Sequence, residues 1–196
     1  MLAGFSPGDV ADYLARFDDR YFLGTPDGRF ADHLRILSSY DGKFPRIVSF
    51  DSPESGTSEL IIACPDQRGL FSKIAGTLSA NGINILNATI STSADGVALD
   101  TFYVTYLGKS LRDDPKKERV VADLTAVLGG ETTVEALIAE RKVSKFLREK
   151  VAKYRPTHVV FDNAVSSRYT VVDIFTYDRI DRKSTRLNSS HMSESR

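Results

Sequence analysis

The sequence has few of the residues on which metal centres and nucleophilic catalysis depend. In 196 residues it contains one cysteine, Cys64, and three histidines, His33, His158 and His191. A single cysteine excludes an intramolecular disulfide and a cysteine-based metal cluster. Neither His33 nor His158 has a partner at the spacing of a metal site, and Cys64 lies in an apolar run, where a small core residue is expected. We therefore expect no metal, no cofactor and no catalytic residue in this chain.

An excess of one charge and a long apolar run are also lacking. Lysine and arginine total 26, as do aspartate and glutamate, whereas a nucleic-acid-binding surface needs a basic excess. No apolar run approaches the length that crosses a bilayer, and no segment resembles a signal peptide. These absences predict a cytoplasmic protein that has neither nucleic acid nor a membrane as its partner.

The most informative segment spans residues 58–107. Its first part, 58–64, contains an apolar run from Leu60 to Cys64 that stops at Pro65, which predicts a buried strand. Asp66 stands at the position of a helix N-cap, and Gly69 permits a positive φ or a close backbone approach. Apolar residues then recur at helical spacing and define one buried face: Leu70, Phe71, Ile74 and Leu78.

The chain then returns through a hairpin. Asn81–Gly82 is a helix stop, and a strand containing Ile83, Ile85 and Ile90 follows it. Asp95–Gly96 is a typical two-residue hairpin turn, which leads into a strand over 97–107. The connection is too short for a parallel crossover, so these two strands should be antiparallel.

Two further helices, 115–128 and 131–150, precede a strand at 157–162. The element order is therefore βαββαβ with an additional helix before the last strand, which predicts a ferredoxin-like α+β sandwich. Upstream, Ser6–Asp9 and Thr25–Asp27 are helix starts, and a turn-rich stretch covers 50–56. We therefore assign residues 1–56 to a helical linker.

Three groups of residues have counterparts in one family. They are the hairpin 95–102, the segments 156–163 and 166–179, and an upstream set of Tyr13, Leu14, residues 20–23 and His33. Together they resemble the ACT-domain family, and most closely the C-terminal region of the bifunctional uridylyltransferase/uridylyl-removing enzymes that act on the PII nitrogen-signalling protein.

The resemblance implies four segments. Residues 1–56 are a helical linker that follows a hydrolase domain, 57–163 are a first ACT domain with an extended helical second crossover, and 166–180 contain the first strand of a truncated second ACT domain. Residues 181–196 resemble a translated sequencing adapter and are excluded from fold reasoning. Met1 is then an internal methionine of a longer gene.

The resemblance also implies a function for the parent enzyme. Glutamine, or another amino acid, binds the ACT region and shifts the parent from uridylylating PII toward removing UMP. The parent's chemistry depends on Mg²⁺, and ACT domains pair with one another. This chain departs from the family at Asp66-Gln67-Arg68-Gly69, where the family has proline before the glycine. Without proline, φ at Arg68 is not fixed and the loop is looser.

The candidate effector site follows from the residues at the start of the predicted helix. Free N–H groups at a helix N-terminus can hold a carboxylate, and the Asn84 amide can bind the polar end of a ligand. In the alternative without ligand binding, Asp66 only caps the helix and Asn84 only starts a strand. The predicted effector-binding residues are Asp66, Gly69, Leu70, Phe71, Asn84 and Ile85.

One further acid is ambiguous from the sequence. Asp100 has the same strand parity as Phe102 and Val104, which would direct its side chain toward the helix layer. A buried carboxylate needs a partner, whereas a solvent-facing one does not, so the solvent-facing orientation is the safer interpretation.

Three functional hypotheses fit these patterns. In the first, the chain is a non-catalytic, glutamine-sensing region of the uridylyltransferase/uridylyl-removing enzyme. This fits the absence of a His–Asp dipeptide and of the Gly–Ser turn with spaced carboxylates that would hold Mg²⁺. In the second, it is a stand-alone tandem ACT sensor without catalysis. In the third, it is a structural ACT pair whose sheet edges associate without a ligand.

Overall fold

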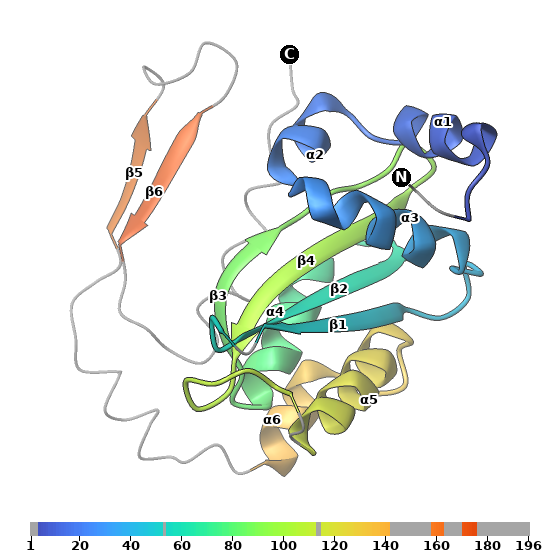
Figure 1. The fold of residues 1–196 in the computed structure, drawn as a ribbon. Helices are drawn as coiled ribbons and strands as arrows, with labels where there is room; N and C mark the ends of the chain where they lie inside the picture. The colour runs from blue at the N-terminus through green and yellow to red at the C-terminus, as the bar shows by residue number, and fades with distance from the viewer. Residues whose placement is uncertain (1–3, 53, 113–114, 142–157, 163–169, 176–196) are drawn as a thin grey trace.

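The computed structural model describes residues 4–52, 54–112, 115–141, 158–162 and 170–175. Four strands form one antiparallel sheet in the order β1-β2-β4-β3 (Figure 1). They are β1 (Arg46–Ser52), β2 (Thr57–Pro65), β3 (Asn84–Thr89) and β4 (Val97–Thr105). With helices packed on it, this sheet is an α+β, ferredoxin-like architecture, as the sequence predicts.

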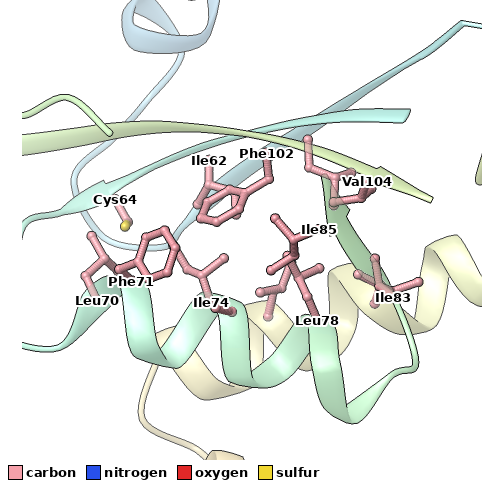
Figure 2. Close-up of a cluster of buried hydrophobic side chains, with 14 of the residues drawn as sticks. Ile62, Cys64, Leu70, Phe71, Ile74, Leu78, Ile83, Ile85, Phe102 and Val104 are labelled. Atoms are coloured by element: carbon pink, nitrogen blue, oxygen red, sulfur yellow. The ribbon is translucent and has the colours of Figure 1, made fainter. Parts of the chain in front are cut away.

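Two helices, α4 (Leu70–Ala80) and α5 (Lys116–Leu128), pack on one face of the sheet, and a third, α6 (Val134–Glu140), packs against both of them. Figure 2 shows Phe71 and Ile74 of α4 in one apolar cluster with Ile62 of β2 and Phe102 of β4. Ile62, Ile74 and Phe102 are fully buried, and burying a side chain of this size contributes about 1.5–3 kcal/mol.

The helical segment that precedes β1 covers the opposite face. It consists of α1 (Pro7–Ala15), α2 (Asp19–Gly24), the 3₁₀ turn η1 (Asp27–Arg29) and α3 (Phe30–Ser38) (Figure 1). Ile61 and Ala63 of β2 pack in a second core with Tyr13, Phe17 and other residues of this segment. Because β2 is buried on both faces, its apolar run does not alternate with polar residues.

Local sequence signals in the core segment are confirmed. Helix α4 begins at Leu70 and ends before Asn81 and Gly82, whose φ is 72°. Gly96 takes the positive φ of 79° that its hairpin position requires, and β3 pairs antiparallel with β4. Helix α5 also lies where the sequence places it.

The first predicted strand is β2, but the sheet is completed by a different strand from the one predicted. The strand predicted at 157–162 is β5 (His158–Asp162), but it pairs with β6 (Val171–Phe175) in a separate two-stranded sheet. The place beside β2 is occupied by β1, which pairs with it antiparallel from Arg46↔Ala63 to Ser52↔Thr57. A short reversal between β1 and β2 makes this pairing local, so part of the proposed linker belongs to the sheet.

Other predictions fall partly outside the described residues. The helix predicted at 131–150 is described as α6 (Val134–Glu140), which Thr133 caps by accepting from the Ala136 amide at 3.2 Å. Residues 142–150 and the tail 181–196 lie outside the described residues. Strand β6 lies within 166–180, and its assignment to a second ACT domain stays a prediction.

The close contact between α4 and α6 requires a residue without a side chain at Gly76, which can be tested by mutation. A Cβ at this position would lie 2.6 Å from Cγ1 of Val134. We expect Gly76→Ala to lower the free energy of unfolding by about 1–2 kcal/mol, since overpacking outweighs the better helix propensity of alanine. Urea denaturation measures this change. Adding Val134→Ala should recover part of the loss, and a Gly76→Ala variant as stable as the parent would show that the two helices do not pack this closely.

Candidate functional site

The loop before α4 is held by the backbone rather than by a side-chain cap. Gly69 is the residue before the helix and has φ 76°, and no side chain caps α4. The Asp66 amide donates to the Gly96 carbonyl oxygen at 2.9 Å, and its carboxylate accepts from the Thr92 hydroxyl at 3.4 Å. The prediction that Asp66 caps α4 is therefore wrong. Asp66 ties the loop to the β3–β4 hairpin instead.

The structure does not bring the six predicted effector residues together. Leu70, Phe71 and Ile85 are 5, 8 and 5% exposed and belong to the core. Asn84 is exposed and pairs with Thr105, at the opposite end of β4 from the Pro65↔Val97 pair that leads into the loop. Of the six, only Asp66 and Gly69 lie in the loop with any exposed surface, and their role in binding stays a prediction.

A buried acid lies behind this loop. Asp100 is 1% exposed, on the face of β4 that packs against α4, and no side chain donates a hydrogen bond to either of its carboxylate oxygens. Burial raises its pKa to about 7; the Ser91 backbone amide opposes this shift and the charge of Asp66 adds to it. The strand-parity interpretation is thus correct, and the solvent-facing one is wrong.

Cys64 is a core residue. It is 1% exposed, and burial raises the pKa of its thiol to about 12, with the charges of Asp100 and Asp66 adding to the shift. A thiol with this pKa is protonated at neutral pH and is a poor nucleophile. Within the described residues, no group of three or more His, Cys, Asp or Glu side chains could hold a metal ion. No helix in the same part of the chain has the length and apolar character needed to cross a membrane.

A hollow of about 370 Å³ lies between the helical segment and the sheet. Its lining includes Arg29, Phe50, Ser55, Thr57, Glu59 and Tyr103. This site was not predicted from the sequence, because Arg29 and Glu59 belong to segments that were assigned to different domains. The only signal was the parity of Glu59 with Ile61 and Ala63, which places all three on the same face of β2.

An ion pair forms one wall of the hollow. Arg29 Nε donates to Glu59 Oε2 at 2.6 Å, and Arg29 Nη1 donates to Asp32 Oδ2 at 3.0 Å. The Arg29 guanidinium lies 4.4 Å from the centre of the Phe50 ring, and the Tyr103 hydroxyl donates to Glu59 Oε1 at 3.2 Å. The Glu59 side chain is 7% exposed, so its charge is balanced at close range, as a buried carboxylate requires.

Comparison with known proteins finds a match to one domain family and to several much longer enzymes. Residues 58–142 match the ACT domain family. The chain is 33% identical over 182 residues to the bifunctional uridylyltransferase/uridylyl-removing enzyme of Gluconobacter oxydans and 37% identical over 182 residues to that of Rhodospirillum rubrum. Each match covers 91% of this chain and 19% of the relative. The chain thus spans about a fifth of the length of these relatives.

Proposed function

We propose that this chain is the glutamine-sensing regulatory region of a bifunctional uridylyltransferase/uridylyl-removing enzyme. It contains a match to the ACT domain family and is similar to these enzymes over most of its length. In the parent, glutamine binding controls uridylylation and deuridylylation of the PII protein. The observation that carries the proposal is the similarity over 91% of the chain, which includes both the helical segment and the ACT domain.

A set of contacts connects the loop before α4 to the helical segment. The Asp66 amide donates to Gly96 in the hairpin, and the hairpin's Asp95 accepts from Arg16, with 2.8 Å between Nη2 and Oδ2. The Ala94 amide also donates to the Arg16 carbonyl oxygen at 2.8 Å. An effector that binds one arrangement of these contacts better than another shifts the population toward it. The helical segment then carries that change to the rest of the parent enzyme.

The chemistry itself belongs to the rest of the parent. We assign Mg²⁺, UTP and PII to other segments of that enzyme, and to this chain only the effector. We expect the parent to be cytoplasmic and its ACT domains to pair through strand edges such as β3.

Titration of the chain with amino acids by isothermal calorimetry tests the proposal. L-glutamine should bind and should raise the melting temperature, because a ligand that binds only the folded state stabilises it. L-leucine serves as the control and should do neither. If none of the common amino acids binds or stabilises the chain, the sensing function is wrong, and a structural role for the ACT domain is favoured.

A further inference from the structure

The hollow between the helical segment and the sheet has the chemistry of an amino-acid site. We propose that it binds the α-ammonium and α-carboxylate groups of a free amino acid, with Arg29 contacting the carboxylate and Glu59 the ammonium. This proposal rests on the proposed sensing function and gives it a location separate from the loop before α4.

The charges of the wall match a zwitterion. A guanidinium carries five N–H donors, and three groups of Arg29, Nε, Nη1 and Nη2, are directed at Glu59 and Asp32. Each Nη group has a second N–H that these contacts do not use. The Glu59 carboxylate accepts from Arg29 and Tyr103 and has lone pairs left over. One positive and one negative group therefore lie side by side with hydrogen-bonding capacity for a ligand that carries both charges.

The other charges near the hollow are compensated. Asp51 also lines it, but its carboxylate is 2.8 Å from Lys117 Nζ and accepts from the Ser58 hydroxyl. Lys117 thus balances Asp51, and Arg29 and Glu59 are the remaining charged side chains of the lining. A ligand that carries only a positive or only a negative charge could pair with one of Arg29 and Glu59. The other residue would then face a like charge or an uncharged part of the ligand.

The rest of the lining suits a short polar side chain. The Ser55 and Thr57 hydroxyls lie 2.7 Å apart, and the Tyr103 hydroxyl is on the neighbouring strand. Hydroxyls both donate and accept, as a carboxamide does. The volume of about 370 Å³ lies within the range of about 300–1,000 Å³ typical of small-molecule sites.

The position of the hollow gives binding a regulatory consequence. Arg29 belongs to η1 of the helical segment, whereas Glu59 and Tyr103 belong to the sheet. A ligand held by both sides stabilises the docked position of the segment, and an undocked segment would lose half of the site. Occupancy of the hollow is thereby coupled to the position of the helical segment.

Calorimetric titration of the full chain with L-glutamine tests the site, using variants chosen to separate the two locations. Arg29→Met should weaken binding at least tenfold, since the ligand loses its hydrogen bonds to a charged group. Arg35→Met is the matched control. Arg35 also pairs with Asp32, at 3.0 Å, but it does not line the hollow, so this variant should bind like the parent.

Two further measurements keep the test valid if Arg29→Met folds poorly. Tyr103→Phe removes only a hydroxyl and should weaken L-glutamine binding severalfold. Glutaramic acid, which is glutamine without its α-ammonium group, should bind at least tenfold more weakly to the parent chain. If L-glutamine binds, but Tyr103→Phe has no effect and Asp66→Asn abolishes binding, the hollow is not the site while the sensing function stands. If no amino acid binds the parent chain, both proposals fail.

Discussion

Replacing Asp100 with asparagine should stabilise the protein at pH 8 by roughly 4 kcal/mol and change its stability little at pH 4. The folded chain holds the Asp100 proton up to about pH 7, whereas an unfolded chain releases it near pH 4. Folding therefore binds protons in that window. The contribution of Asp100 to the stability of the parent therefore falls as the pH rises from about 4 to about 7, and it is constant above that range.

The variant isolates the charge because its shape is nearly unchanged. Protonated aspartate and asparagine both place a neutral polar group at the same buried position, so they differ mainly in their ability to ionise. Urea denaturation at several pH values gives the free energy of unfolding for both chains. The control is Asp95→Asn, because the Ser93 hydroxyl and Arg16 hold the pKa of Asp95 below its usual value and its loss should destabilise at pH 8. If Asp100→Asn leaves the slope unchanged, Asp100 is paired or hydrated in solution.

The sequence predicted those elements that depend on local signals. The apolar run of β2, the left-handed Gly69 and the Asp95–Gly96 turn constrain the backbone over a few residues, and each is found where it was expected. Their geometry follows from sterics and short-range burial, which one stretch of sequence contains. The ferredoxin-like class could be predicted for the same reason.

Strand pairing could not be predicted in this way. Val48 and Phe50 in β1 alternate with Ser49 and Asp51, as in a half-buried strand, but the turn residues that follow favoured a linker. The strand at 158–162 was found at its expected place and assigned to the wrong partner. Which strand takes the position beside β2 depends on the competition between distant segments, and a local pattern does not contain that competition.

The buried acid and the hollow could be predicted only in part, because they too depend on contacts between distant segments. Strand parity placed Asp100 on the helix-facing side of β4, but only the packed structure shows that no partner neutralises it. The Arg29–Glu59 pair joins a helical segment to a strand 30 positions later. This pair forms only when the helical segment covers the second face of the sheet. Burial of both faces is a tertiary property, and no local sequence motif indicates it.

Replacing His33 with glutamine should produce the opposite change in pH dependence. His33 is 4% exposed, its Nδ1 lies 2.7 Å from the Tyr21 hydroxyl, and burial lowers its pKa to about 4. An unfolded histidine binds a proton near pH 6.5. The stability that neutral His33 gives the parent is therefore complete above about pH 6.5, and roughly 3 kcal/mol of it is lost as the pH falls to about 4.

The two titrations have opposite signs over nearly the same range, so they partly cancel in the parent chain. We expect the stability of the parent to vary little between pH 4 and 7, that of Asp100→Asn to rise with pH because His33 remains, and that of His33→Gln to fall with pH because Asp100 remains. The slope is the quantity to compare, since the packing cost of glutamine is the same at every pH. A double variant should again be nearly flat, because the two groups lie on opposite faces of the sheet and distant sites are additive. A His33→Gln slope equal to that of the parent would show that the helical segment does not bury His33 in solution.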